Sequence, residues 1–362
     1  MPDVDPLPAA PDPEALTSSW AWLTEREPHL RIRDAAARLG VAESQLLATR
    51  CGDGVERIRL EPARILPRLR ALGRLLALTR NEAFVHERSG VYEECRTEGP
   101  VLSVTGPEVD LRIFPAAWDH AYAQTDVGAH GARLSLHFFD AHGEAVHKIH
   151  STSETDQPSF QALVAELRAP RQDRVQPVRP PSPVHRDRPD SEVDPDALEA
   201  GWRALTDTHA FHGLLRRLRV GRTQALRMVP DELARPTPVL SLRTVLETAA
   251  AEGLPMVLFV RSPGTLQIHH GTVHDVQEAQ GWFNVLDRDF NLHVLESAIG
   301  GAWVVRKPVE PAAGWVTSLE FYDPRGSLQA LFFGQRPRGA PEDPRWTGLL
   351  TDLPGAPVPH PG

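Results

Sequence analysis

The order of apolar and polar positions divides the chain into two similar halves. Apolar positions repeat every three or four residues over 14–48 and 62–78, which predicts amphipathic helices. Short alternating segments fill residues 83–150 and predict an antiparallel sheet, which begins with a hairpin around a Ser89-Gly90 turn. After residue 195 helices return and strand patterns follow. The predicted helices are 195–219, 222–229 and 241–252, and the strand patterns lie between 256 and 333.

Short sequence matches between the halves indicate an internal duplication. Leu23-Thr24 matches Leu205-Thr206, and the segment from Ser135 to Gly143 matches the one from Ser318 to Gly326. Asp110-Leu-Arg-Ile-Phe matches Asn291-Leu-His-Val-Leu. The shifts are 181 to 183 residues, so the chain is predicted to hold two copies of one α+β unit. Each copy would pack a helical cluster on a large antiparallel sheet.

Proline-rich stretches suggest the boundaries of these copies. The chain has 362 residues and 34 prolines, which gather near both ends and around residues 170–195. The predicted organisation is a disordered leader (1–14), an N-terminal repeat (15–169), a linker (170–194), a C-terminal repeat (195–350) and a disordered tail (351–362).

Composition excludes several classes of protein. The net charge of −9 argues against a general nucleic-acid binder. A helix-turn-helix pattern begins at Ala35, but its second helix has no Arg or Lys before Arg50. No apolar run reaches the roughly 20 residues of a membrane span, the first residues do not resemble a signal peptide, and the two cysteines form no CxxC motif. The cytoplasm is therefore the expected location.

The candidate chemistry begins with His209, in the segment from Trp202 to Leu215. This segment reads as one amphipathic helix in which Leu205, His209 and His212 follow one another at helical spacing. A histidine on an apolar helix face is either a core residue with a hydrogen-bond partner or a ligand. At a shift of 182 residues His209 matches Glu27, so the scaffold does not need the histidine. Both interpretations stay open on these grounds.

Basic residues supply the other candidates. Arg112 and Phe114 alternate with Leu111 and Ile113 along a strand, which predicts that Arg112 and Phe114 share one face. Individually such cations are usually solvated, but together some could form a local positive rim for carboxylates. The candidates for the rim are Arg222, Lys307 and Arg336. His269 and His270 point to opposite faces of a strand, so a metal site that joins them to His274 is not expected.

Many of these segments resemble a known family, the cytoplasmic hemin-degrading and haem-trafficking proteins of bacterial haem uptake (the HemS/ShuS/ChuS/PhuS group). The resemblance covers about residues 15–350. In the first half it rests on Leu78-Thr-Arg-Asn-Glu, Gly106-Pro-Glu-Val-Asp-Leu-Arg-Ile-Phe and Phe138-Phe-Asp-Ala-His-Gly. In the second half it rests on Trp202-Arg-Ala-Leu-Thr-Asp-Thr-His, Gln224-Ala-Leu-Arg, Ala302-Trp-Val-Val-Arg-Lys-Pro and Gly334-Gln-Arg.

The resemblance implies a role for each candidate. Haem would sit in a cleft between the halves, with His209 as the proximal iron ligand. Arg112 would be a distal arginine with Phe114 beside it, and Arg222, Lys307 and Arg336 would lie near the haem carboxylates. Family members often carry tyrosine where this chain has Phe333, whose ring keeps the packing surface but lacks the hydroxyl.

Two functions follow from the resemblance. In the first, the protein binds haem and degrades it, using oxygen and an external electron donor, with Arg112 and His209 as the catalytic residues. In the second, it is a haem carrier that delivers haem to a separate haem oxygenase. An inner-membrane haem importer would be a partner in either case, and neither nucleic acid binding nor membrane insertion is expected.

Overall fold

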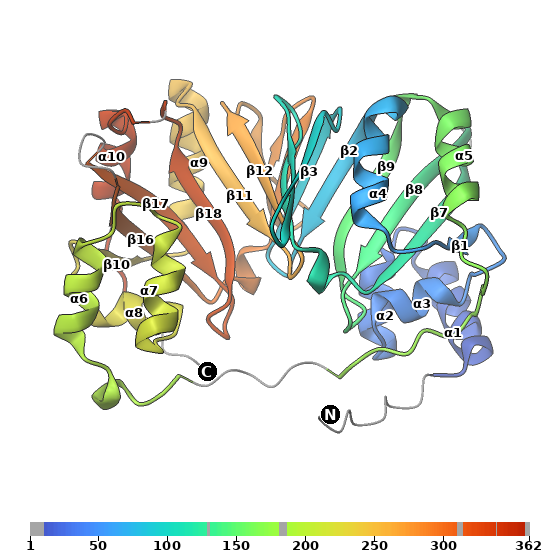
Figure 1. The fold of residues 1–362 in the computed structure, drawn as a ribbon, viewed down its shortest axis with the longest axis horizontal. Helices are drawn as coiled ribbons and strands as arrows, with labels where there is room; N and C mark the ends of the chain where they lie inside the picture. Colours follow the sequence, from blue (N-terminus) through green and yellow to red (C-terminus); the bar gives the residue numbers. More distant parts are fainter. Residues whose placement is uncertain (1–10, 129–130, 181–186, 310–313, 338, 359–362) are drawn as a thin grey trace. The chain divides into compact units, whose positions relative to one another are not determined.

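The computed structural model describes residues 11–128, 131–180, 187–309, 314–337 and 339–358 (Figure 1). The chain separates into two compact units. Unit 1 comprises Met1–Arg80, Glu87–Ser182 and Ser262–Gln267, and unit 2 comprises Asn81–His86, Pro183–Arg261 and Ile268–Gly362. Most residues of the predicted leader and the end of the predicted tail lie outside the described residues, and the first helix already begins at Pro13.

Among its described residues, unit 1 combines five α-helices with an antiparallel sheet, as the alternating pattern predicts. Its central strands run in the order β1-β7-β8-β9-β2, and β4, β5 and β6 form a separate antiparallel ladder. The helices are α1 (Pro13–Arg26), α2 (Ile32–Leu39), α3 (Glu43–Ala48), α4 (Pro62–Leu69) and α5 (Gln157–Leu167). The strands are β1 (Val55–Arg57), β2 (Gly73–Arg80), β3 (Phe84–Gly90), β4 (Glu94–Glu98), β5 (Val101–Thr105), β6 (Asp110–Ile113), β7 (His120–Gly128), β8 (Gly131–Phe139) and β9 (Ala145–Thr155), and β3 starts in unit 2.

The two faces of the unit 1 sheet carry different helices. Helices α4 and α5 cover one face, where Ile65, Leu69 and Leu163 pack against Leu136 and Ile149. Leu47 and Ala48 of α3 pack against Tyr122 and Phe139 on the opposite face. Because successive side chains of a strand point to opposite faces, the same strands contribute residues to both cores.

Unit 2 follows the same plan. Its strands run β10-β16-β17-β18-β11, with a second ladder of β13, β14 and β15. The helices are α6 (Pro195–Arg203), α7 (Ala210–Leu218), α8 (Arg222–Met228), α9 (Ser241–Glu252) and α10 (Pro344–Thr351). The strands are β10 (Ala234–Thr237), β11 (Met256–Arg261), β12 (Thr265–Gly271), β13 (Val276–Ala279), β14 (Trp282–Leu286), β15 (Phe290–Val294), β16 (Gly301–Pro308), β17 (Trp315–Tyr322) and β18 (Leu328–Gly334). Strand β12 starts in unit 1.

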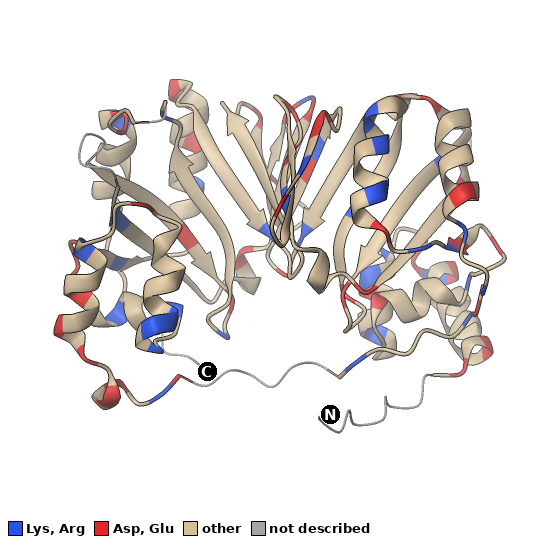
Figure 2. Ribbon diagram, viewed as in Figure 1, with Lys and Arg blue, Asp and Glu red and all other residues tan. Residues whose placement is uncertain are grey.

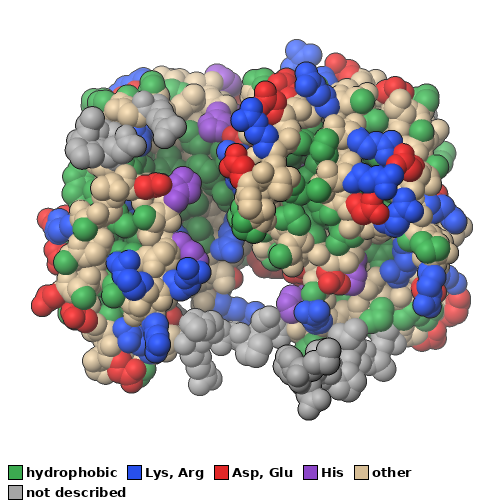
Figure 3. All heavy atoms as spheres, viewed as in Figure 1, with side chains coloured by type: hydrophobic (Ala, Val, Ile, Leu, Met, Phe, Trp, Pro, Cys, Tyr) green, Lys and Arg blue, Asp and Glu red, His purple; other side chains and the backbone are tan. Residues whose placement is uncertain are grey.

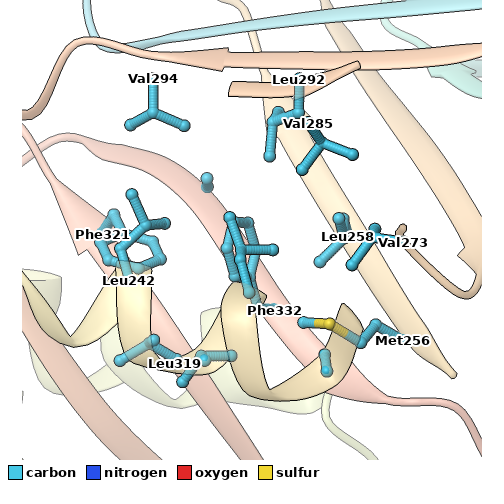
Figure 4. Close-up of a cluster of buried hydrophobic side chains, with 14 of the residues drawn as sticks. Leu242, Met256, Leu258, Val273, Val285, Leu292, Val294, Leu319, Phe321 and Phe332 are labelled. Carbon is cyan, nitrogen blue, oxygen red and sulfur yellow. The ribbon is translucent and has the colours of Figure 1, made fainter. Parts of the chain in front are cut away.

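The larger core of unit 2 lies under α9 and α10. Figure 4 shows Leu242 of α9 among Leu319, Phe321 and Phe332 of the sheet. On the opposite face, Trp202 of α6 and Phe211 of α7 pack against Trp303 and Tyr322. The α+β prediction is therefore confirmed: both units carry helices on a large antiparallel sheet.

A shared turn shows that the units are built alike. In β8–β9 the carboxylate of Asp140 accepts hydrogen bonds from the backbone N–H groups of His142 (2.9 Å) and Glu144 (3.0 Å). In β17–β18 Asp323 accepts the same pair from Arg325 (2.9 Å) and Ser327 (2.7 Å). The glycines of the two turns, 143 and 326, have φ values of 82° and 80°, a left-handed conformation that glycine adopts without strain. The matching Asp-x-x-Gly segments are therefore one structural motif used twice.

The prediction of one helix over 62–78 is wrong in its second half. Helix α4 ends at Leu69, and β2 begins at Gly73, where φ is 78°. Leu75 and Ala77 are buried at strand spacing. The leucines at 72, 75 and 76 fit the periodicity of a helix or of a strand. The turn at Gly73 ends the helical segment and starts the strand.

The predicted hairpin around Ser89-Gly90 is also wrong. Strand β3 continues through Gly90, and β4 pairs with β5 instead. A Cβ atom at position 90 would lie 2.5 Å from the Cβ of Glu108, so this glycine serves close packing and not a turn.

None of the helices among the described residues is both long enough and apolar enough to cross a lipid bilayer.

Candidate functional site

The segment that carries His209 is a turn between two helices and not one helix. Helix α6 ends at Arg203, α7 begins at Ala210, and His209 is the N-cap residue of α7. The predicted continuous helix over 195–219 is therefore wrong at residues 204–209. Thr206, Asp207 and Thr208 favour turns because their side chains compete for backbone hydrogen bonds.

Asp207 positions the imidazole of His209. Its Oδ1 accepts the backbone N–H of His209 (2.9 Å) and lies 2.8 Å from Nδ1 of the same residue. A carboxylate beside Nδ1 holds the proton on that nitrogen and leaves the lone pair on Nε2. The His209 side chain is 91% exposed, so Nε2 is accessible to a ligand.

Neither histidine lies on the buried apolar face, although the sequence predicted that both would. Leu205, Phe211 and Leu214 are buried, whereas His209 and His212 are exposed. The interpretation of His209 as a core histidine is therefore wrong, and its ligand role stays a prediction.

A buried ion network lies beside α7, in the core formed by α6, α7, α8 and the sheet. Glu320 of β17 is fully buried, and its Oε1 accepts a hydrogen bond from Nζ of Lys307 at 2.6 Å. Its Oε2 accepts one from Nη2 of Arg222 at 2.8 Å and one from the hydroxyl of Tyr322. Ser318 also donates to Oε1, at 3.0 Å. Every acceptor site of this carboxylate is used, which makes its burial tolerable.

The network shifts the pKa values of its members. Burial lowers the pKa of Lys307 to about 8 although Glu320 opposes this change. Burial acts to raise the pKa of Glu320, but Arg222 and Lys307 outweigh it and hold that pKa well below its usual value. One carboxylate thus faces two cations, and the network carries a net positive charge near neutral pH.

Phe211 joins this network to α7. Its ring lies 5.2 Å from the Arg222 guanidinium carbon and 4.9 Å from Lys307 Nζ. Both cations therefore contact the face of one aromatic ring, which adds cation–π attraction to the ion pairs. Of the predicted positive rim, Arg222 and Lys307 are brought together. Lys307 is buried, however, and was not expected to be.

The same face of the unit 2 sheet continues as a partly open apolar surface. The register of β11, β17 and β18 places Val257, Phe259, Leu331 and Phe333 on the face that carries Glu320. All four are only partly buried. The rings of Phe259 and Phe333 pack 5.5 Å apart in a T-shaped arrangement. Unit 2 thus presents an apolar wall beside a net positive cluster.

The remaining predicted residues lie elsewhere. Arg336, beyond β18, donates to the backbone carbonyl of Ala340 at 2.7 Å. Arg112 and Phe114 belong to unit 1. As predicted, Leu111 and Ile113 are buried, while Arg112 is half-buried and Phe114 is 40% exposed. Arg112 forms an ion pair with Asp110 and donates to the carbonyl of Leu111 at 3.0 Å.

Two alternatives from the sequence can be judged from side-chain positions. All six residues of α3, the supposed recognition helix, are buried, and Glu43 forms ion pairs with Arg80 and Lys148. A recognition helix needs exposed side chains. His269 is buried and His270 is exposed, on opposite faces of β12 as predicted. Among the residues that the structure describes, no group of three or more His, Cys, Asp or Glu side chains is arranged to hold a metal ion.

Sequence reasoning missed Asp207, Glu320 and Tyr322. The alternation Ser318-x-Glu320-x-Tyr322 on one strand face was a usable signal, since a carboxylate on a buried face needs cations nearby. Asp207 stands two residues before His209, the spacing at which an aspartate accepts a backbone N–H in a turn.

Comparison with known proteins now identifies the family. The model of the haemin-degrading HemS.ChuX domain matches residues 40–167 and 219–353. The chain belongs to this family.

Curated relatives and solved structures agree with this family. The chain is 36% identical to the hemin transport proteins HmuS of Yersinia pestis and HemS of Yersinia enterocolitica over 324 residues, 89% of this chain and 92% of each relative. The crystal structure of holo-PhuS, a heme-binding protein from Pseudomonas aeruginosa, matches with a TM-score of 0.91 and 40% identity, covering 96% of this chain and all of that one. The heme degrading enzyme ChuS of Escherichia coli O157:H7 matches with a TM-score of 0.87 and 32% identity, over 94% of this chain and 99% of the other.

Proposed function

We propose that this protein binds haem, with Nε2 of His209 as the ligand of the iron, and that it degrades the haem when oxygen and electrons are supplied. The observation that carries the proposal is the pairing of Asp207 with Nδ1 of His209, which leaves Nε2 exposed and in the correct tautomer. The relatives support the ligand, because PhuS is named a heme-binding protein and HmuS a hemin transport protein.

The surroundings of α7 suit haem. Haem is a flat apolar molecule with two carboxylates, and it needs apolar walls and a few cations. Val257, Phe259, Leu331 and Phe333 offer such a wall in unit 2. Arg222 and Lys307 supply a net positive charge, and they would stabilise the carboxylates.

The residues of this chain would divide the work as follows. His209 holds the haem, and Asp207 holds the imidazole in one orientation. Arg112, once released from Asp110, would donate hydrogen bonds to oxygen or water at the bound haem, and Phe114 would exclude further water. Bound haem itself supplies the iron whose redox chemistry opens the ring.

A second role, delivery of haem to a separate oxygenase, is favoured by the exposure of His209. A ligand that is 91% exposed at the start of a nine-residue helix is accessible to an incoming acceptor. The names of the relatives cover both roles, since one is a heme degrading enzyme and others are hemin transport proteins. A cytoplasmic location, an external electron donor and an inner-membrane haem importer are parts of this proposal.

A haem titration tests the ligand. Hemin added to the purified protein should produce a Soret band at one equivalent, and His209→Ala should lose it or shift it. Asp207→Asn should weaken binding by roughly 10–100-fold, because a carboxylate behind a ligating histidine contributes that much to metal affinity. His212→Ala is the matched control on the same helix and should keep the band. Loss of the band in His212→Ala but not in His209→Ala would show that the assignment is wrong.

A second experiment separates the two roles. The haem complex receives a reductant and oxygen in the presence of catalase, which removes free peroxide. Decay of the Soret band with a ring-opened product supports degradation. An intact band, followed by transfer to an added haem oxygenase, supports delivery and rules out degradation as the role of this protein.

A further inference from the structure

Unit 2 contains a basic cavity at the C-terminal end of α7. Its volume is about 830 Å³, within the range of small-molecule sites. Five arginines line it: Arg188, Arg216, Arg219, Arg222 and Arg261. In Figure 2 the ribbon of the last turn of α7 carries the colour of Lys and Arg, and Figure 3 shows Lys and Arg gathered over the corner that holds α6 and α7.

The arginines converge from separate parts of the chain. Arg216 and Arg219 come from the end of α7, Arg222 from α8, Arg261 from the end of β11, and Arg188 from the segment before α6. Cations at the end of α7 suit the helix dipole, which is reason enough for Arg216. The dipole does not explain why three other elements place an arginine at the same cavity.

Most of this charge is not neutralised within unit 2. Arg222 is paired with Glu320, and Glu192 is the one carboxylate among the lining residues. Within the part of the chain that the structure describes, Arg216, Arg219 and Arg261 form no ion pair. Four arginines thus face one carboxylate, which leaves an excess of about three positive charges.

Two arginines of the lining lie in unfavourable surroundings. Arg188 donates from Nη2 to the carbonyl of Leu218 at 2.8 Å, but its Nε is buried with no hydrogen-bond partner among the described residues. A buried donor without a partner costs about 1–3 kcal/mol. Partial desolvation, together with repulsion from Arg222, lowers the pKa of Arg261, although its side chain is exposed. An anion in the cavity would offset the repulsion between Arg261 and Arg222.

The apolar part of the lining narrows the ligand class. Leu215, Val220 and Leu328 contribute apolar surface beside the guanidinium groups. A simple inorganic ion would leave this surface and most of the volume unused. Guanidinium groups bind phosphate through paired hydrogen bonds, and a ligand with about three negative charges matches the excess.

We propose that this cavity binds a small organic anion that carries two or more phosphate groups. The site lies on the face of α7 that begins at His209, since residues 209, 212, 216 and 219 share one side of a helix. Arg219 is about 15 Å along the helix axis from His209, so the phosphate groups bind at Arg216 and Arg219, far from the iron ligand, while Arg222 stays paired with Glu320.

Calorimetric titration of the full-length protein at physiological salt tests this proposal, with ADP as the probe. ADP should bind one to one, pyrophosphate more weakly, and adenosine not measurably. The variant Arg216→Ala with Arg219→Asn should lose at least tenfold in affinity for ADP. Asn is chosen because position 219 has a φ of 53°, which asparagine tolerates. Arg217→Ala, on the same turn but outside the cavity, should stay within twofold of the unchanged protein.

The haem complex provides the decisive comparison. ADP should bind the haem-loaded protein as it binds the free protein, and the arginine variants should keep the Soret band that depends on His209. Loss of ADP binding after haem loading would mean that haem carboxylates fill the cavity, and would overturn the proposal. Equal losses in Arg217→Ala, or no binding of ADP at millimolar concentration, would overturn it as well. A failure of the haem proposal would appear only in the Soret band.

Discussion

At the corner where a short helix meets the sheet, the first residue of that helix carries opposite charges in the two units. In unit 1, Glu43 begins α3 and forms ion pairs with Arg80 and Lys148 of the sheet. In unit 2, Arg222 begins α8 and forms an ion pair with Glu320 of the sheet, beside Lys307. The acid lies on the helix in one unit and on the sheet in the other.

The two helices correspond residue by residue. The side chain of Gln45 accepts a hydrogen bond from the N–H of Ala42 (3.0 Å), and Gln224 accepts one from Gly221 (3.3 Å). These glutamines hold the third position of each helix, so Glu43 and Arg222 hold the first. The duplicated scaffold therefore tolerates an exchange of the acidic and a basic residue between helix and sheet, provided that each buried carboxylate keeps two cations.

The difference lies in what surrounds each corner. In unit 2 the ring of Phe211 covers both cations, and this residue lies in the first turn of α7, two residues after His209. The position that matches His209 in unit 1 is Glu27, which forms an ion pair with Arg38 on the surface. Both corners thus bury one carboxylate with two cations. Only the corner of unit 2 lies beside a candidate iron ligand, His209.

The largest effect should come from removal of either buried carboxylate. Glu320→Gln and Glu43→Gln each leave two cations without a charged partner, and breaking a buried pair costs about 3–5 kcal/mol. Urea unfolding should show a similar loss of stability for both. Haem titration at low urea should separate them, with an altered affinity only for Glu320→Gln. Equal effects on haem affinity would show that the corner of unit 2 has no special role.

A second effect, which is small near neutral pH and grows as the pH falls, concerns acid stability. Burial lowers the pKa of His147 and of His150, each to about 3, and that of His137 well below its usual value. These histidines stay neutral in folded unit 1 but take up protons when unfolded below about pH 6.5. Their contribution to stability is therefore present above pH 6.5 and is lost as the pH falls towards 3, by up to about 1.4 kcal/mol per pH unit for each.

The corresponding position in unit 2 offers the matched variant. Ser135 pairs with His150 across the strands, and the matching Ser318 pairs with Phe333. His150→Phe should make the stability of unit 1 less dependent on pH between 6.5 and 3. Hydrogen exchange measured on peptides of β8 and β9 would report this change. An unchanged pH dependence would mean that His150 does not titrate on unfolding.

The smallest expected effect concerns Lys307. Its pKa of about 8 means that it loses its charge as the pH rises through that value. Haem affinity should fall by less than about tenfold, or 1.4 kcal/mol, between pH 7 and pH 9. The folded-state pKa lies below the unfolded value, so the contribution of this lysine to stability rises over the same range, and unfolding cannot explain the loss. Lys307→Arg should bind haem equally at both pH values, and a parallel fall in this variant would rule out Lys307 as the cause.

The sequence pattern predicted those elements whose helical spacing or strand alternation is clear over a short stretch of chain. Helix α9 occupies 241–252 as its spacing indicates, and Leu111 and Ile113 are buried together because successive side chains of a strand alternate. The duplication was readable because the turns at Asp140 and Asp323 need the same residues. The leucines of β2 were misassigned because their spacing fits a helix and a strand equally well.

The sequence by itself determined the α+β class, the repeat and the family. It also placed Asp207 two residues before His209, although the turn between α6 and α7 was needed to bring the carboxylate onto Nδ1. Tertiary structure alone decided the ion network and the basic cavity. Arg222 and Glu320 are 98 residues apart, and five arginines reach the cavity from four parts of the chain. No local pattern encodes such a meeting, because the strand order and the helix positions that produce it are set by the packing of the whole unit.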